Sequence, residues 1–403
     1  MLTYLLDWLG LLARWLHVVA GIAWIGVSFH FVWLDNHLQP PRGGDPVDPE
    51  VGGEAWAVHD GSIYRAQKYR VAPSQMPATL HWLHWDAYTS WLSGFALLGL
   101  LYFLRAEAYL IDPAVAPLSK SAAIAIALAA LVASWLAYDA LCRSSLAQHT
   151  AALTSMLAAL FGALAWGLCH LFSGRGAFMI FGASLGTIMA ANVAHVIVPG
   201  QRELVRAKQE GREIDPAPGL RGKQRSVHNT YFTLPVLFVM ISNHYAVTYG
   251  ARNNWLVLIA LSFAGACLRA WVVARHRPSE NQGLVVALPG MVGMATLAAV
   301  VYALAPVRTS PVSMATPAPA AGTARVQMIV QQRCAPCHAT MPTQPGFSAA
   351  PNGLVLQTLD QLEAHLPEVQ RQLTMRTMPL GNVTMMTEDE RALMLMWIGH
   401  PRH

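Results

Sequence analysis

The chain has 403 residues, of which 54% are hydrophobic and only 12% are charged, and its mean hydropathy is +0.36. Because a soluble domain normally carries about a quarter charged residues, these values exclude an ordinary soluble protein and indicate a polytopic membrane protein. The net charge of +5 is concentrated in a few loops, so we interpret it as a signal of membrane topology and not of nucleic-acid binding.

Eight apolar segments follow one another along the first 305 residues. Each is long enough to cross about 30 Å of hydrocarbon as a helix. The sequence therefore predicts an all-α fold, with a polytopic bundle of eight transmembrane helices over residues 1–305. Met1–Leu6 has neither a basic segment nor a small-residue cleavage site, so we expect no removable signal peptide. The predicted spans are residues 9–34, 82–104, 121–141, 153–172, 177–199, 229–249, 254–274 and 284–305.

The basic residues of the loops predict the orientation of the bundle. With the N-terminus outside the cytoplasm, the inner loops hold fourteen lysines and arginines and the outer loops hold four. Cytoplasmic loops are enriched in these residues. We therefore expect a multi-pass protein of a bacterial inner membrane, with both termini on the periplasmic side.

The stretch between the first two predicted spans, residues 35–80, is too polar for another span and too long for a simple turn. Pro46, Pro49 and Gly52 are typical of a loop. We expect an irregular loop here, in which Trp56–Tyr69 folds over the cytoplasmic mouth of the bundle.

The composition changes after the last predicted span. Residues 306–322 are rich in Pro, Ala, Ser and Thr, which is typical of a semi-extended linker. Residues 323–403 have the pattern of a small soluble helical domain. We expect helices at Ala324–Arg333 and Thr358–Leu373, the second interrupted by its proline, and a last helix that begins with a capping box at Thr387–Glu390.

Cys334-Ala335-Pro336-Cys337-His338 is the attachment signature of a c-type haem. The thiols of Cys334 and Cys337 would form thioether bonds to the haem, and His338 would be its proximal iron ligand. The alternatives are a redox dithiol, which needs no histidine, and a zinc site, for which the region offers only His365 as a further ligand. The motif predicts covalent haem c and electron transfer, and residues 323–403 as a cytochrome c domain.

A methionine is the predicted sixth ligand of that iron. Met378 precedes Pro379, which fixes an extended turn from which a thioether could point at the iron. Methionine opposite histidine raises the reduction potential, which suits an electron acceptor. Met375 and Met385 are the next candidates, and a pair of histidines with His365 is the alternative.

Histidines inside the predicted spans are costly in a bilayer and usually have a purpose. His17 is the best-placed candidate for binding a b-type haem, because Gly21 one turn later would let a flat macrocycle approach the helix. His170, also toward the outer side, is the second candidate. In the alternative, such histidines only hold the bundle together by hydrogen bonds to backbone carbonyls or polar side chains. The candidate side-chain partners are Asp139, Asn192 and Asn243.

Several stretches carry a resemblance to a known family. They are RWLH followed by GIAWIG and SFH in the first span, GGEAWAVHDGSIYRAQKY, LHWLHWDAYTSW, AANVAHVIVPGQ, HNTYFTLPVLFVMISNHY, and the tail CAPCHAT with TMPLGNVTMMTEDERALMLMWI. Together they resemble the membrane-bound urate oxidases that carry a C-terminal cytochrome c domain. The resemblance implies oxidation of urate to 5-hydroxyisourate with water as the oxygen source. It also implies that electrons pass through the cytochrome c to a respiratory oxidase, without hydrogen peroxide.

For such an enzyme we expect a urate site near the inner side of the bundle, lined by His84, His195 and Arg269. Arg269 would receive the anionic substrate through a bidentate contact, and a histidine would take the proton of the attacking water. Asp86 and Asp139 lie at a similar depth and could instead neutralise the arginine.

Two other functions remain open from the residues themselves. The first is a quinol–cytochrome c reductase, in which the membrane histidines would hold two b-type haems. The second is a transporter or metal-handling bundle with an electron-carrying tail. Reduction of the haem by quinol without urate would favour the first, and substrate uptake that depends on the bundle histidines would favour the second.

Overall fold

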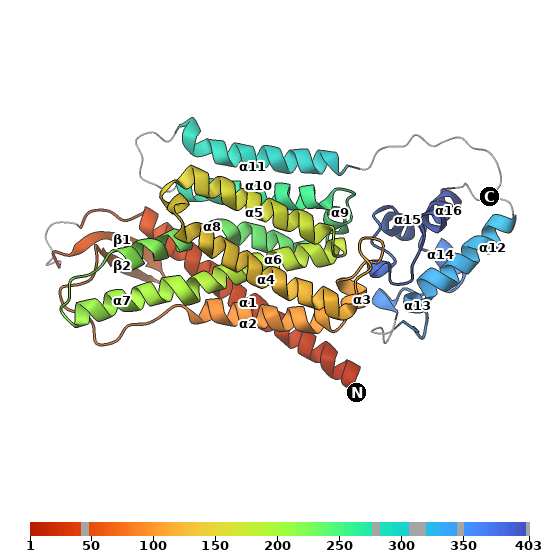
Figure 1. Ribbon diagram of the computed structural model, residues 1–403, viewed down its shortest axis with the longest axis horizontal. Coiled ribbons are helices and arrows are strands. Elements are labelled where there is room, and N and C mark those ends of the chain that lie inside the picture. The colour runs from red at the N-terminus through yellow and green to blue at the C-terminus, as the bar shows by residue number, and fades with distance from the viewer. Residues whose placement is uncertain (42–47, 276–282, 306–319, 345–349, 400–403) are drawn as a thin grey trace.

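The computed structural model describes residues 1–41, 48–275, 283–305, 320–344 and 350–399. The described part is mostly helical, with a long bundle and a smaller group of helices at one end of it (Figure 1). The bundle consists of α1 (Leu2–Asn36), α2 (Trp85–Leu97), α3 (Ala106–Tyr109), α4 (Lys120–Arg143), α5 (Thr150–Cys169), α6 (Gly174–Asn192), α7 (Val198–Gln209), α8 (Ala217–Ser242), α9 (Ala246–Tyr249), α10 (Asn254–Ala274) and α11 (Leu284–Ala303).

Within the described residues, six helices are long and apolar enough to cross a membrane. They are α1, α4, α5, the continuous helix that joins α6 to α7, α10 and α11. The other two predicted spans are also helical, but their composition is weaker. In the first, α2 ends at Leu97 and continues as a π-helical turn, Leu98–Phe103. In the second, α8 carries Arg221, Lys223 and Arg225 in its first half. The count of eight spans therefore stays a prediction.

A π-helical turn, Val193–Ile197, joins α6 to α7. It precedes Pro199, which has no N–H to donate to the carbonyl four residues earlier, at His195. Such a gap in the hydrogen-bond ladder is relieved by a wider turn, and π-bulges of this kind are frequent at functional sites. The sequence thus sets His195 on an irregular turn.

α6 is the central helix of the bundle and packs against α2, α4, α5 and α8. Phe178, Ile180 and Leu185 are buried along it. Gly182 allows the closest approach, because a Cβ atom there would lie 2.5 Å from Cγ1 of Val239 on α8. Small residues at helix contacts are the usual means of tight packing inside a membrane.

The expectation of an all-α fold with an irregular loop over residues 35–80 is wrong at one place. β1 (Val51–His59) and β2 (Ser62–Tyr69) form an antiparallel hairpin, with Ala55 opposite Ala66. Its turn is Asp60-Gly61, and both residues have positive φ, 50° and 71°. An Asp-Gly pair between two strands favours the turn that matches the strand twist. The loop interpretation overlooked this signal in HDGS.

The hairpin has one buried charged group. Glu54 on β1 is 1% exposed, and its Oε2 atom accepts a bond from Arg65 Nε on β2 at 2.7 Å. A buried carboxylate requires such a partner. This ion pair therefore fixes the two strands to each other at the end of the bundle where α7 also lies (Figure 1).

The C-terminal helices form a separate hydrophobic core. They are α12 (Ala320–Ile329), a π-helical turn Val330–Cys334, α13 (Ala335–His338), α14 (Leu359–Glu363), α15 (Leu366–Thr374) and α16 (Glu388–Ile398). Val326, Leu362 and Met394 are fully buried among them. The predicted capping box of the last helix is confirmed, with Thr387 and Glu390 each bound to the other's backbone N–H.

The interruption expected near Pro367 is also confirmed, since α14 ends at Glu363 and α15 begins at Leu366, with Pro367 in its first turn. Of the predicted linker, residues 306–319 lie outside the described residues. Its last three residues, 320–322, belong to α12 and not to a linker.

The C-terminal helices contact the bundle at α3 and α9 (Figure 1). The short helical turn Leu380–Asn382 packs on α3. A Cβ atom at Gly250, just after α9, would lie 2.4 Å from the carbonyl oxygen of Met375. The two backbones therefore meet so closely that only a glycine fits there. The segment that carries Met378 thus lies between the C-terminal core and the bundle.

Candidate functional site

The haem attachment motif lies at the junction of the π-helical turn and α13. Cys334 and Cys337 are free cysteines, and Cys337 is buried. Burial raises the pKa of the Cys334 thiol to about 12 and also raises the pKa of Cys337.

The ring of His338 is held by a hydrogen bond to the backbone. This ring is buried, and Nδ1 lies 2.9 Å from the carbonyl oxygen of Leu354. Because a carbonyl only accepts hydrogen bonds, Nδ1 must carry the proton, and Nε2 keeps a free lone pair. A carbonyl behind the ring in this way fixes the tautomer and the orientation of a ligating histidine.

Met378 is held in place through its backbone. Its carbonyl oxygen accepts a bond from Nη1 of Arg391 on α16 at 2.8 Å, and the same nitrogen binds the carbonyl oxygen of Leu373 at 3.1 Å. Burial lowers the pKa of Arg391. Of the alternative ligands, Met385 is 65% exposed and His365 is also exposed, whereas Met375 is half-buried like Met378. Exposure therefore disfavours Met385 and His365 and does not separate Met378 from Met375, so the sixth ligand stays a prediction.

The residues present fit a covalently attached haem. Cys334, Cys337, His338 and Met378 would hold it, with the apolar C-terminal core beside it. The zinc alternative is weaker, because in the described part of the chain no three His, Cys, Asp or Glu side chains are grouped so as to hold a metal ion.

The two histidines predicted to bind a membrane haem have ordinary hydrogen bonds. His17 Nδ1 on α1 lies 2.9 Å from the carbonyl oxygen of Ser90 on α2. Gly94 leaves room for this ring, since a Cβ there would lie 2.9 Å from Cε1 of His17. His170 is exposed at the end of α5, and its Nδ1 binds the carbonyl oxygen of Trp166 at 2.7 Å. These bonds agree with a structural role and leave each Nε2 atom free, so haem binding here stays a prediction.

The polar groups considered as partners of the membrane histidines pair elsewhere. Asn192 donates to Tyr138 and Asn229, and Asn243 accepts from Tyr102 and Arg175.

The three residues predicted to line the urate site lie in separate surroundings. Arg269 on α10 is 3% exposed and lies 3.7 Å from the centre of the Phe29 ring. Its Nε and Nη2 atoms have no hydrogen-bond partner among the described residues. His84 precedes α2 and stacks on Trp85 at 5.4 Å. Neither residue lines the cavity that contains His195.

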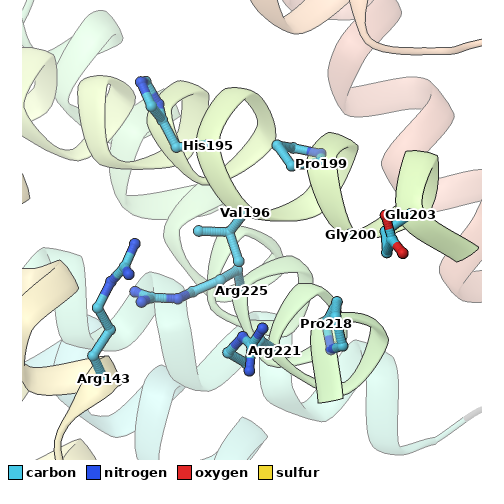
Figure 2. A pocket seen from close by; sticks show the side chains of 9 residues that line it. All are labelled: Arg143, His195, Val196, Pro199, Gly200, Glu203, Pro218, Arg221 and Arg225. Carbon is cyan, nitrogen blue, oxygen red and sulfur yellow. The ribbon is translucent and has the colours of Figure 1, made fainter. Parts of the chain in front are cut away.

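That cavity has a volume of about 250 Å³ and lies between α4, the α6–α7 junction and α8 (Figure 2). Figure 2 shows the guanidinium groups of Arg143 and Arg225 beside each other. The wall of the cavity is cationic, since it carries three arginines and only one carboxylate, that of Glu203. The lining residues are Arg143, His195, Val196, Pro199, Gly200, Glu203, Pro218, Arg221 and Arg225.

Asp139 on α4 organises the arginines of this cavity. Its Oδ1 atom accepts a bond from Arg225 Nη2 at 2.7 Å, and its Oδ2 atom accepts one from Arg143 Nε at 2.6 Å. The Arg225 side chain is only 3% exposed, and its Nη1 atom is buried with no partner in the described part of the chain. Because Asp139 is paired with Arg143 and Arg225, it does not neutralise Arg269, which was one of the alternatives considered from the sequence.

His195 projects from the π-helical turn at the rim of the cavity. Its Nδ1 atom lies 3.2 Å from the carbonyl oxygen of Ala191, so Nδ1 carries the proton and Nε2 has the free lone pair. Trp135 on α4 lies against the ring, with 5.2 Å between the ring centres. A histidine with a free nitrogen beside a cationic cavity can act as a general base toward a bound anion.

Sequence reasoning found His195 but missed Arg143 and Arg225, which it counted only as loop charges. A usable signal was present. Arg225 lies one helical turn before His228 and Asn229, so the three share a face of α8 that turns toward the interior. His228 binds the hydroxyl of Tyr138 at 2.7 Å, which extends the same polar face.

A comparison with protein families gives one match. The model described as urate oxidase N-terminal matches residues 3–303, from α1 to α11, and ends before the haem attachment motif. No curated protein and no solved structure matched the chain.

Proposed function

Because the chain belongs to the urate oxidase N-terminal family, we propose that it oxidises urate to 5-hydroxyisourate and delivers the electrons to a c-type haem on Cys334 and Cys337. The family description points to an oxidoreductase acting on urate. The haem motif, which lies outside the matched residues, supplies the acceptor. The family match is the observation that carries the substrate, and the geometry of His338 supports the haem.

The reaction balances without molecular oxygen. The urate monoanion and one water give 5-hydroxyisourate, one proton and two electrons. When bound, a c-type haem supplies a one-electron acceptor with a raised potential if His338 and Met378 are its ligands. The chain itself holds those ligands in place, through the carbonyl oxygen of Leu354 at His338 and through Arg391 at Met378. No hydrogen peroxide forms on this route.

The six long apolar helices agree with a membrane protein. We propose that it spans a bacterial inner membrane, with its termini on the periplasmic side, and that a cytochrome or terminal oxidase of the respiratory chain takes its electrons. The asymmetry of Lys and Arg between the loops supports this orientation.

The direct test is anaerobic titration of the purified full chain with urate, following the absorbance of reduced c-type haem. We expect urate to reduce the haem without peroxide. Cys337→Ser should lose the covalent haem, whereas the matched variant Cys267→Ser on α10 should keep it. If urate leaves the haem oxidised while dithionite reduces it, urate is not the donor. Reduction by quinol alone would then identify a quinol–cytochrome c reductase.

A further inference from the structure

The cavity between α4, the α6–α7 junction and α8 has the cationic side chains of an anion-binding site. Arg225 lines it, and Nη1 of this arginine is buried without a hydrogen-bond acceptor among the described residues, while its guanidinium carbon lies 4.9 Å from the centre of the Tyr138 ring. Burying such a group without a partner is costly. We propose that the cavity binds the urate anion, with Arg225 and Arg143 as its cationic clamp. This proposal rests on the proposed function and adds the place where the substrate binds.

The charges around the cavity leave a positive excess. Asp139 is shared by the two guanidinium groups of Arg225 and Arg143, one carboxylate oxygen to each. Glu203 lies on the wall, but it is paired with Arg206 and Arg212, which do not line the cavity. Arg221 adds a third, exposed cation. An organic anion would complete this set, because planar guanidinium groups bind carbonyl and oxyanion groups through paired hydrogen bonds.

His195 is placed to accept the proton of the reaction. The C–O bond forms between C5 of the purine and the oxygen of a water molecule. The proton of that water goes to Nε2 of His195, whose Nδ1 is already committed to the carbonyl oxygen of Ala191. A haem held by Cys334, Cys337 and His338 would accept these two electrons one at a time and pass each on to the external electron acceptor. The π-helical turn sets the ring at the rim, where water reaches it.

α7, which carries part of the cavity wall, lies at the end of the bundle opposite the C-terminal helices (Figure 1). Seventeen residues of α8 separate Arg225 from Ser242, which corresponds to about 25 Å along the helix. The electrons must cross this distance. The proposal therefore requires a second one-electron carrier of the haem class within the bundle, and the ratio of b-type to c-type haem in the purified protein measures whether one is present.

The experiment is equilibrium binding of urate to the full-length protein in detergent, with the haem held oxidised and no electron acceptor. Arg143→Gln removes one cation, and Arg225→Lys keeps the charge but loses the planar donor pair. We expect Arg225→Lys and Arg143→Gln to weaken urate binding by about 10- to 100-fold, as for a lost charge-assisted hydrogen bond. The matched control is Arg70→Gln, an exposed arginine after β2 with the same loss of charge.

Turnover separates binding from chemistry. His195→Gln should bind urate nearly as well as the parent protein, yet reduce its haem about 100-fold more slowly, the lower end of what a positioned base contributes. Dithionite should reduce the haem of every variant normally. Equal rates in His195→Gln and the parent protein would overturn the role of the histidine.

Three results would overturn the site. The first is unchanged urate affinity in the Arg143 and Arg225 variants. The second is equally tight binding of the neutral purine hypoxanthine. The third is equal displacement of urate by inorganic phosphate or by vesicles of anionic phospholipid, which would make the cavity a headgroup site. If urate still reduces the haem of all these variants at the parental rate, the proposed function stands and only its location fails. If the parent protein neither binds urate nor is reduced by it, both fail.

Discussion

Replacing Asp139 by asparagine tests whether one carboxylate holds the cationic cavity together. Asp139 is the partner of Arg225 at 2.7 Å, and their side chains are 15% and 3% exposed. The amide of the new side chain would keep the shape but lose the charge, and leave a buried guanidinium uncompensated. Breaking a buried pair from one side costs about 3–5 kcal/mol. We expect Asp139→Asn to lose stability toward the lower end of that range, because its carboxylate is partly exposed.

The assay is reversible unfolding of the full chain in detergent, followed by circular dichroism. The double variant Asp139→Asn/Arg225→Gln removes both charges, so it should regain most of the lost free energy of unfolding. Glu203→Gln is the control, because its pairs are more exposed and such pairs contribute at most about 1 kcal/mol. A loss below about 1 kcal/mol in Asp139→Asn, or a double variant less stable than the single one, would refute this account.

Three further outcomes follow from the described contacts. Desolvation raises the pKa of Glu390, but its arginine and threonine partners outweigh it and hold the pKa below its usual value. The stability that this carboxylate contributes is therefore present above its unfolded pKa and is lost as the pH falls through its folded pKa. Glu390→Gln should destabilise the C-terminal helices at neutral pH and have no effect in acid. Thermal melts at both pH values measure this difference. Met378→Ala should lower the reduction potential of the attached haem in a redox titration, whereas Met385→Ala should leave it unchanged. Gly182→Ala should cost about 1–3 kcal/mol of stability through overpacking, while Gly186→Ala, with open space around it, should cost nothing measurable in the same melts.

The helices were the most predictable part of the chain, because apolar stretches of about twenty residues leave few alternatives in a membrane. The capping box at Thr387 was equally clear, since both partners lie three residues apart. The hairpin is missed because Gly52 is typical of a loop, although Asp60-Gly61 carries the turn of the hairpin. Glycines that favour a loop and an Asp-Gly pair that favours a hairpin give opposite predictions for this stretch. The pairing of the two strands in the folded chain decides between them.

The cationic cavity could be predicted only in part. His195 stood out as a histidine inside an apolar segment. Arg143 and Arg225 belong to loops and polar helix ends in the sequence, where arginine is common. Arg143 lies four residues after Asp139 on α4, but only the approach of α8 to α4 brings Arg225 to the same carboxylate. The contact of Arg225 joins residues far apart in the chain, and no spacing within one helix reveals it.

The close approach at Gly250 has a practical consequence for how the chain could be divided. The contacts of Met375 and of Leu380–Asn382 with the bundle do not involve residues 306–319. Two separately encoded polypeptides, 1–305 and 320–403, should therefore still associate when the second is given a signal peptide that exports it to the periplasm. Such a bipartite version would let the cytochrome half be exchanged without rebuilding its partner, and Gly250→Leu should prevent the reassembly.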